Sequence, residues 1–270
     1  GGKEVASFQV EEYRKPEFRV ATNWEDHGES ILVYQDVSAV VRGDFLFGAP
    51  MAGAEVRWSL EERETDFAPP GNQGFVFSDI EATDLTWPTW NPRSFLRPRN
   101  HGQTGSGTLD ENGALRVSLK LEPSHPERHT PRVFTLETVV RDETHQEAES
   151  SAALVAHWAE RAVGISIEKE LVQAGQPVVV AAVVTDLLGR RYPAAGVRVE
   201  LVEPNWTPKV KESSDDSSER LPQYTYSEKS VGRCDLTASE EPGTCSIVPP
   251  HAGLFLVRAE TVDAKGRAAH

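Results

Sequence analysis

Two pairs of segments repeat each other in order along the chain, and this internal duplication limits the fold more than any other feature of the sequence. The segment VVRGDFLFGAPMAGAEVRWSLEE (residues 40–62) corresponds to VVTDLLGRRYPAAGVRVELVE (residues 183–203). In each, an apolar strand leads through a glycine-containing loop and a Pro-x-Ala-Gly sequence into an alternating strand that ends in leucine and acid. Further along, VFTLETVVRDETHQEAESSAALVAH (residues 133–157) matches LFLVRAETVDAKGRAAH (residues 254–270). A duplication of roughly 110 to 150 residues predicts two similar domains.

Both copies are dominated by alternation of apolar and polar residues with a period of two. This pattern is typical of strands with one buried and one solvated face. The 18 prolines and 20 glycines separate short apolar runs, and no amphipathic pattern extends beyond about two helical turns. At 270 residues the chain is long enough for two domains. The sequence therefore predicts an all-β protein built from two tandem antiparallel β-sandwiches with an immunoglobulin- or fibronectin-like architecture.

The predicted boundary between the domains lies in HWAERAVGISIEKELVQAGQPVVV. Here Ser166 to Leu171 is expected to form a strand, and residues 173–177 a turn into the next strand. This places the junction at 159–162 and divides the chain into residues 1–160 and 161–270.

The second copy is shorter than the first at its end. The first copy has a further strand from Glu147 to His157, where the second has only Ala268, Ala269 and His270. The last strand of the second domain is therefore expected to be truncated. Because truncation would leave an unpaired sheet edge, we expect the chain to be a fragment of a longer one.

Two connections are unusually long for a compact domain. Residues 61–107 form a predicted insertion in the first domain, and Asn205 to Tyr226 form a predicted loop that contains the acidic stretch KESSDDSSER. Loops of this length are either functional or mobile. Within the insertion, GQTGSG (residues 102–107) is expected to be a flexible turn, because it lacks the lysine of a phosphate-binding loop.

The net charge of −14 argues against a nucleic-acid partner or an anionic membrane surface, since both require clustered Lys and Arg. No apolar run reaches the roughly 18 residues of a membrane span, so direct membrane insertion is not expected.

The two cysteines, Cys234 and Cys245, both lie in RCDLTASEEPGTCSI. Their spacing fits a disulfide across a hairpin whose turn is Glu241-Pro242-Gly243. Without a nearby pair of histidines the two cysteines do not predict a zinc site. A disulfide would place the chain in an oxidising compartment, and the alternative is two buried thiols in a cytosolic domain.

The stretch FQVEEYRKPEFRV (residues 8–20) contains two strand-like alternations separated by Pro16. Proline removes a ladder donor and restricts Lys15 to an extended conformation, which ends one strand and permits a change of partner. The stretch resembles the segment that leads into a macroglobulin-like domain in the alpha-2-macroglobulin and complement family. Three further stretches resemble the bacterial branch of that family: PPGNQGFVFSD, VGISIEKELVQAGQPVVVAAVVTDLLGR and CDLTASEEPGTCSIVPPHAGLFLVRA.

The resemblance implies two macroglobulin-like domains of a broad-spectrum protease inhibitor. In that family a protease cuts a bait segment, the molecule rearranges, and a buried thioester reacts with protease lysines. The thioester motif, a Cys-x-Glu-Gln run, matches neither Cys234 nor Cys245. These domains are therefore expected to be structural scaffold, with no enzymatic activity and no cofactor. The implied partners are neighbouring macroglobulin-like domains and target proteases, with a cell-wall synthase as a further option. The implied location is the bacterial periplasm, with a lipid-anchored parent as an option.

One alternative function comes from LTWPTWNPRSFL, where Trp87, Trp90 and Phe95 alternate with prolines. These rings either form an aromatic platform that binds carbohydrate or cell wall, or pack beneath the insertion and hold it in place. In HPERH, His125 and His129 are four residues apart, but the surrounding prolines exclude the helix that an HExxH zinc site requires.

Overall fold

The structure, a computed structural model, describes residues 17–25, 30–77, 100–126, 128–209 and 223–270. Within these ranges every regular element is a strand, and the strands form antiparallel sheets, which confirms the predicted all-β class. The strands are β1 Phe18–Trp24, β2 Asp36–Phe45, β3 Glu55–Glu64, β4 Asn100–Thr108, β5 Ala114–Lys120, β6 Arg132–Arg141, β7 Glu147–Ala156, β8 Ala162–Ile167, β9 Val178–Thr185, β10 Ala195–Lys209, β11 Gln223–Ala238, β12 Gly243–Ile247, β13 Leu256–Val262 and β14 Ala268–Ala269.

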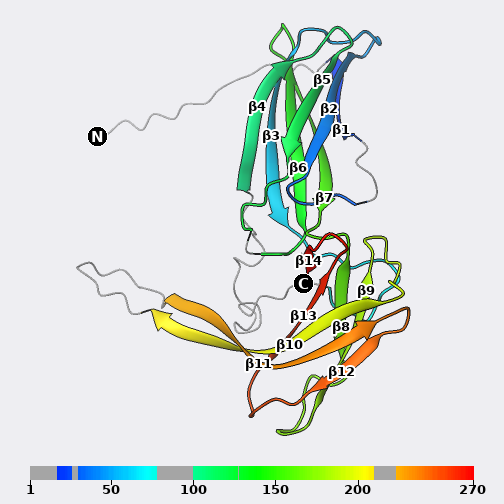
Figure 1. Ribbon diagram of the computed structural model, residues 1–270. Coiled ribbons are helices and arrows are strands. Elements are labelled where there is room, and N and C mark those ends of the chain that lie inside the picture. Colours follow the sequence, from blue (N-terminus) through cyan, green and yellow to red (C-terminus); the bar gives the residue numbers. More distant parts are fainter. Residues whose placement is uncertain (1–16, 26–29, 78–99, 127, 210–222) are drawn as a thin grey trace, which may run out of the picture.

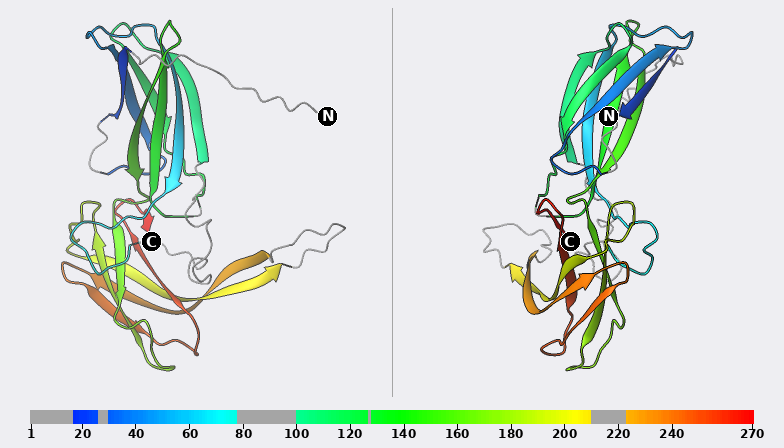
Figure 2. Two further views of the ribbon diagram at one scale, coloured as in Figure 1. Left: turned by 180° about the vertical axis from the view of Figure 1, so that it is seen from behind. Right: turned by 45° about the vertical axis from the view of Figure 1, so that its right-hand side comes forward.

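The strands build two sandwiches that follow one another along the long axis of the molecule (Figures 1 and 2). The first sandwich, β1–β7, packs the sheet β1-β2-β5 against the sheet β4-β3-β6-β7. The second sandwich, β8–β14, packs β8-β9-β12 against β11-β10-β13-β14. The two orders correspond strand for strand, as an internal duplication requires. The strand β14 has 2 residues where its counterpart β7 has 10.

Each sandwich has its own core, formed by the inward-facing residues of both of its sheets. These alternate with more exposed residues along the strands, as on β2, where every second residue from Val37 to Gly43 is buried. The first core includes Val41, Val56, Leu60, Leu119, Phe134 and Leu136. The second includes Val163, Val180, Val184, Val199, Leu201 and Leu236.

The strand expected at Ser166 to Leu171 lies earlier in the structure, because β8 spans Ala162–Ile167. The alternation that defines this strand begins at Val163, and the polar residues that follow Ile167 lead into the loop before β9. The predicted turn at residues 173–177 contains a hydrogen bond from the Gln176 N–H to the Gln173 carbonyl, at 3.0 Å.

The predicted insertion is shorter than residues 61–107, because β3 runs to Glu64 and Asn100–Thr108 is strand β4. GQTGSG is therefore part of a strand and not a turn. Its glycines permit close packing against neighbouring side chains: a Cβ on Gly105 would lie 2.3 Å from the Trp58 ring. A Cβ on Gly107 would lie 2.9 Å from the Leu115 side chain. Glycine in a strand often marks such a close approach.

The loop expected from Asn205 to Tyr226 is also partly strand. Beyond Val202, where the pairing of β10 with β13 ends, β10 and β11 continue as a two-stranded arm that projects from the second sandwich (Figure 1, yellow and orange). Trp206 and Tyr226 pair across the arm, with ring centroids 5.2 Å apart. Cross-strand aromatic pairs stabilise such ribbons. The acidic stretch KESSDDSSER lies outside the described residues.

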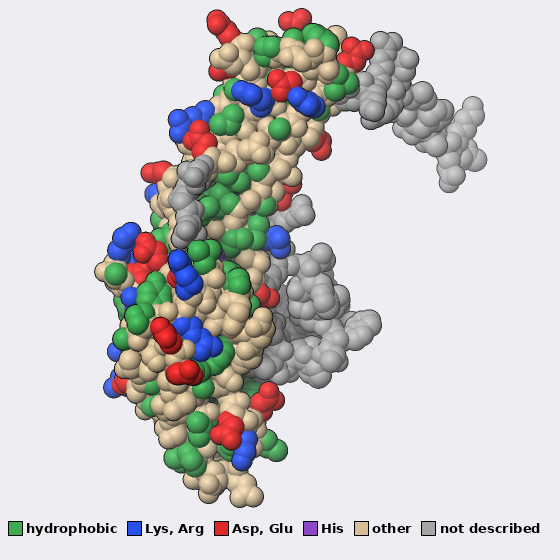
Figure 3. Space-filling model, turned by 90° about the vertical axis from the view of Figure 1, so that its right-hand side faces the viewer, with side chains coloured by type: hydrophobic (Ala, Val, Ile, Leu, Met, Phe, Trp, Pro, Cys, Tyr) green, Lys and Arg blue, Asp and Glu red, His purple; other side chains and the backbone are tan. Residues whose placement is uncertain are grey.

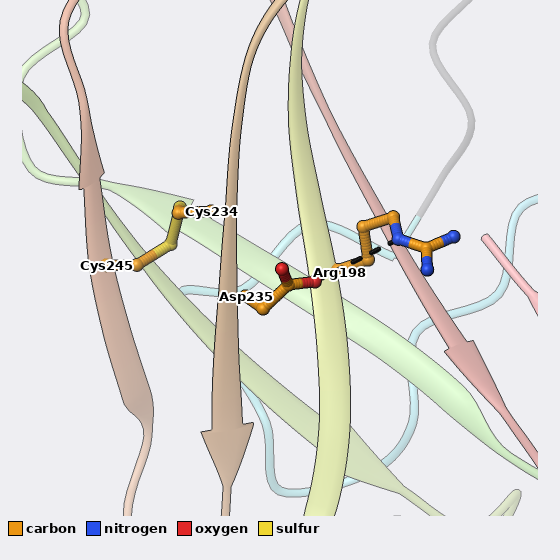
Figure 4. Close-up of a disulfide and its surroundings, with 4 residues drawn as sticks. All are labelled: Arg198, Cys234, Asp235 and Cys245. Carbon is orange, nitrogen blue, oxygen red and sulfur yellow. Dashed lines mark ion pairs between the residues drawn. A yellow bond between two sulfur atoms is a disulfide. The ribbon is translucent and has the colours of Figure 1, made fainter.

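Cys234 and Cys245 form a disulfide in the structure, with their Cα atoms 6.2 Å apart. The expected hairpin is wrong, because Cys234 lies on β11 and Cys245 on β12, which are edge strands of the two different sheets of the second sandwich (Figure 4). Cys234 pairs with Val199 of β10, and Cys245 with Val180 of β9. The turn at Glu241 therefore carries the chain from one sheet to the other, and the disulfide joins the two sheets.

Replacing both cysteines with serine should lower the free energy of unfolding of the chain by about 2 to 3 kcal/mol, because the crosslink closes a short loop in the unfolded chain. Urea unfolding followed by circular dichroism would measure this, with the oxidised parent chain as control. An unchanged unfolding midpoint would contradict a stabilising role for the disulfide.

Candidate functional site: the joint between the sandwiches

The residues that could have marked a catalytic or ligand site do not gather into one in the described part of the chain. No group of three or more His, Cys, Asp or Glu residues there is arranged to hold a metal ion. Trp87, Trp90 and Phe95 lie outside the described residues, so the aromatic platform stays a prediction. Among the described residues there is also no helix with the length and apolar composition needed to cross a membrane. A set of specific long-range hydrogen bonds lies where the two sandwiches meet.

A segment of the first sandwich crosses to the second at this joint. We call residues 65–77, which follow β3, the strap. The strap begins at the base of the first sandwich, where the Thr65 N–H donates to the Pro131 carbonyl at 3.0 Å. It ends against β8, the first strand of the second sandwich. The connection between β3 and β4 therefore contacts both sandwiches.

Asn72 fixes the middle of the strap, and its side chain is almost entirely enclosed, with 4% exposed. Its amide nitrogen donates to the carbonyls of Pro70 and Gly189, both at 2.9 Å. Its side-chain oxygen accepts a hydrogen bond from Arg191 Nε at 3.1 Å. Arg191 in turn donates to the Glu240 carbonyl at 2.8 Å. Because buried polar groups are costly unless they are bonded, this network specifies one position of the strap.

Gly189 is fitted to the strap by its lack of a side chain. Its φ angle is 90°, in the left-handed region that favours glycine. A Cβ at this position would lie 2.1 Å from the Pro70 carbonyl oxygen. Any larger residue at position 189 would therefore collide with the backbone of the strap at Pro70.

The end of the strap extends the three-stranded sheet of the second sandwich. The Val76 N–H donates to the Ile165 carbonyl at 2.8 Å, and the Ile165 N–H donates to the Val76 carbonyl at 3.0 Å. Phe77 is buried over Gly164, where a Cβ would lie 2.4 Å from its ring. One residue of the first sandwich thus pairs with the free edge of β8, in the manner of strand addition.

The linker between the sandwiches, residues 157–161 between β7 and β8, is held by the turn between β13 and β14. The Glu160 N–H donates to Asp263 Oδ2 at 3.1 Å, and the Glu160 carboxylate pairs with Lys265 and Arg267 at 2.9 and 2.8 Å. Arg161 donates to the Val262 carbonyl at 3.0 Å, and its guanidinium lies 4.2 Å from the Tyr192 ring centroid. Short linkers fixed in this way restrict motion between domains.

Asp263 organises this turn through an ionised carboxylate. Burial acts to raise its pKa, but hydrogen bonds from the backbone of Arg267 and Glu160 and from the Arg267 guanidinium outweigh burial and lower the pKa to about 2. The carboxylate is therefore charged at neutral pH and remains an acceptor for both the linker and its own turn.

A buried ionic network holds the base of the first sandwich, where the strap begins. Arg132, which is fully enclosed, pairs with Glu64 at 2.7 Å and with Glu62 at 3.5 Å. Its guanidinium also donates to the carbonyls of His125 and Arg128, both at 3.0 Å. Arg132 thus ties the end of β3 to the loop before β6. Both histidines of HPERH lie in this region. The His125 carbonyl accepts the bond from Arg132, and the ring of His129 stacks on that of His270, with centroids 4.6 Å apart.

His157 and Trp158, which directly follow β7, contact the strap and the loop before β6. The Phe67 ring of the strap contacts His157 edge-on, with ring centroids 4.4 Å apart. Trp158 donates its indole N–H to the Thr130 carbonyl at 2.8 Å. Burial lowers the pKa of His157 to about 4, so the ring is neutral at neutral pH.

Sequence patterns alone did not identify this joint. PPGNQGFVFSD was notable only for its resemblance to a family, and nothing in its composition indicates that Asn72 is buried against residues more than 100 positions away. The only local signal is the sequence Pro69-Pro70-Gly71-Asn72, which is typical of a rigid turn.

Three comparisons place this fold among known proteins. No protein-family model matches the chain. An alpha-2-macroglobulin homolog from Nostoc sp. is 22% identical over 268 residues, which cover 98% of this chain and 13% of that protein. The native conformation of Escherichia coli alpha-2-macroglobulin superposes with a TM-score of 0.65 at 20% identity, covering 93% of this chain and 16% of that one. Salmonella alpha-2-macroglobulin reacted with methylamine superposes with a TM-score of 0.64 at 18% identity, covering 96% and 16%.

The fold is therefore that of tandem macroglobulin-like domains. The resemblance to bacterial alpha-2-macroglobulins that the sequence indicated is confirmed along most of the chain. The chain spans about one-eighth to one-sixth of the length of these relatives.

Changing Asn72 to Ala should loosen the strap, because the substitution leaves the Gly189 carbonyl and Arg191 without their shared partner. Unmet buried polar groups cost about 1 to 3 kcal/mol. Hydrogen–deuterium exchange should show faster exchange of the Val76 and Ile165 amides. Asn112→Ala, at an exposed turn, is the matched control and should leave these amides unchanged. Equal protection in the Asn72 variant would show that the strap does not depend on its side chain.

Stability should fall as the pH drops from about 6.5 to about 4, through His157. The folded chain keeps this ring neutral in that interval while the unfolded chain binds a proton, so acid favours unfolding. A shift from 6.5 to about 4 corresponds to roughly 3 kcal/mol once the pH is below both values. Urea unfolding at pH 7 and pH 4 would measure the loss, which should be smaller in His157→Gln. An equal loss in both proteins would assign the effect to other groups.

Proposed function

We propose that the chain consists of two tandem domains, residues 1–160 and 161–270, that form structural scaffold in a bacterial alpha-2-macroglobulin-like protease inhibitor. The observation that carries this proposal is the match of 93–98% of the chain to two bacterial alpha-2-macroglobulins, in sequence for one and in fold for the other. Scaffold domains need no catalytic residue, and their task is to hold a fixed geometry around the region that a protease cleaves.

The joint supports this role physically. The contacts of Asn72 with Gly189 and of Asp263 with Glu160 constrain the relative position of the two sandwiches at two separate places. A cage that encloses a protease needs walls of defined shape, and flexibly linked domains would not provide one. Domains joined without such contacts are expected to move relative to each other.

The proposed setting is the periplasm of a bacterium, with neighbouring macroglobulin-like domains and target proteases as partners. The Cys234–Cys245 disulfide supports an oxidising compartment. Acidic and basic side chains are interspersed over the surface seen in Figure 3, which supports protein neighbours over nucleic acid. A lipid-anchored parent and contact with a cell-wall synthase are additional proposals, to be tested by fractionation and by pull-down.

The longer natural chain that carries these residues should reduce the cleavage of a large protein substrate by several unrelated proteases. The isolated 270-residue chain in excess should leave that cleavage unchanged, because two sandwiches supply at most one wall of a cage. Residual protease activity after incubation is the measurement, with albumin as the inert control. Stoichiometric inhibition by the isolated chain, or a covalent adduct between it and a protease, would contradict the scaffold role, as would a longer chain that inhibits no protease.

A further inference from the structure

Five turns in the described part of the chain share one backbone geometry. In each, the first residue donates its N–H to the carbonyl of the fifth, and the fourth donates to the carbonyl of the first. Four of them begin with an aspartate whose carboxylate also accepts the N–H of the fifth residue: Asp110, Asp142, Asp186 and Asp263. An aspartate in this position stabilises the turn.

The fifth turn, residues 45–49, has the same backbone bonds but begins with Phe45. The Phe45 N–H donates to the Ala49 carbonyl and the Gly48 N–H to the Phe45 carbonyl, both at 2.8 Å. Without an aspartate the carboxylate bond is absent. The turn carries two exposed apolar residues, Leu46 at 65% and Phe47 at 78% exposure. The rings of Phe45 and Phe47 stack, with centroids 5.2 Å apart.

Turn 45–49 occupies the same place in the first sandwich that turn 186–190 occupies in the second. Each follows the middle strand of a three-stranded sheet, β2 or β9. Met51 donates to the Gly43 carbonyl at 3.0 Å, and Tyr192 donates to the Val184 carbonyl at the same distance. The fourth residues of the two turns, Gly48 and Gly189, have φ angles of 93° and 90°.

Each turn also lies beside the point where the chain enters its sandwich. The first residue of β1 pairs with Phe45, and the first residue of β8 pairs with Thr185. In addition, the Leu46 N–H donates to the carbonyl of Glu17, at 2.8 Å. A domain that preceded either sandwich would therefore arrive next to this turn.

The two turns differ in what covers them. Turn 186–190 is covered by the strap of the first sandwich, whose Pro70 carbonyl lies where a Gly189 side chain would be. At Gly48 nothing among the described residues lies within 4 Å of the corresponding position. Leu46, Phe47 and the stacked Phe45 ring place several apolar groups together on this turn, and exposed apolar patches mark interaction sites.

We propose that turn 45–49 is the docking site for the strap of a further β-sandwich that lies N-terminal to residue 1 in the parent protein. The repeat supplies the occupant: the equivalent turn of the second sandwich is bound by an extended segment of the sandwich before it. Leu46 and Phe47 would pack against that segment, and the open face of Gly48 would admit its backbone as Gly189 admits Pro70. This inference rests on the proposed function, since it requires a parent protein with successive sandwiches.

The test compares the labelling of a thiol in the 270-residue chain and in the longer natural chain. Phe47→Cys is reacted with a maleimide while the native disulfide is intact. Ser151→Cys, at an exposed position on the edge strand β7, is the matched control. The thiol at position 47 should react at least about tenfold more slowly in the longer chain, which corresponds to about 1.4 kcal/mol in favour of the covered state. The control should react equally in both chains.

Hydrogen–deuterium exchange of residues 46–48 in the unsubstituted chains gives a second readout should Phe47→Cys fold poorly. Equal labelling in both chains, or a longer natural chain with no sandwich N-terminal to residue 1, would overturn the proposal. So would slow labelling in the 270-residue chain that becomes fast after removal of residues 1–16, because that segment would then be the occupant. A parent that inhibits proteases but labels freely at position 47 contradicts only this inference. A protected position 47 in a parent that inhibits no protease contradicts only the proposed function.

Discussion

The arrangement of the two sandwiches depends on the hydrogen bonds that the buried Asn72 amide donates to two backbone carbonyls. Each sandwich has its own core, so each domain could form without the other. The strap does not add a third hydrophobic core. It fixes the relative orientation of the sandwiches through directional hydrogen bonds. Asn72 accepts from one side chain and donates to two carbonyls, and this set of bonds exists only when the first sandwich, the strap and turn 186–190 are in one arrangement. The linker contacts of Asp263 and Glu160 act at a second place, which limits rotation about the strap.

The duplication explains why such a joint forms at this position. Both sandwiches use the same strand order. In both, a long connection follows the third strand, which is β3 in the first sandwich and β10 in the second. In the first sandwich this connection becomes a strap that binds the next domain. In the second it begins as the arm of β10 and β11, which leaves the sheet at Val202, where the pairing with β13 ends. Pro204 and Pro208 lie on this arm, where an edge strand tolerates proline because one side needs no ladder donor.

The number and kind of domains could be predicted from the sequence because both follow from local regularities. Alternation with a period of two and the repeated Pro-x-Ala-Gly segments are visible in short windows. Two local interpretations were wrong for related reasons. The glycines of GQTGSG resemble a turn, but they serve close packing against Trp58 and Leu115 in a strand. The residues between Cys234 and Cys245 resemble a hairpin, but the chain changes sheets there.

The joint could not be predicted, because its contacts link residues 117 and 119 positions apart and depend on the burial of one amide side chain. We expect these contacts to hold the two sandwiches in a single arrangement. The most direct measurement is the distribution of distances between spin labels at Ser151→Cys on β7 and Arg198→Cys on β10, one in each sandwich. We expect a single narrow distribution in the native chain that broadens with Asn72→Ala. A broad distribution in the native chain would contradict this expectation.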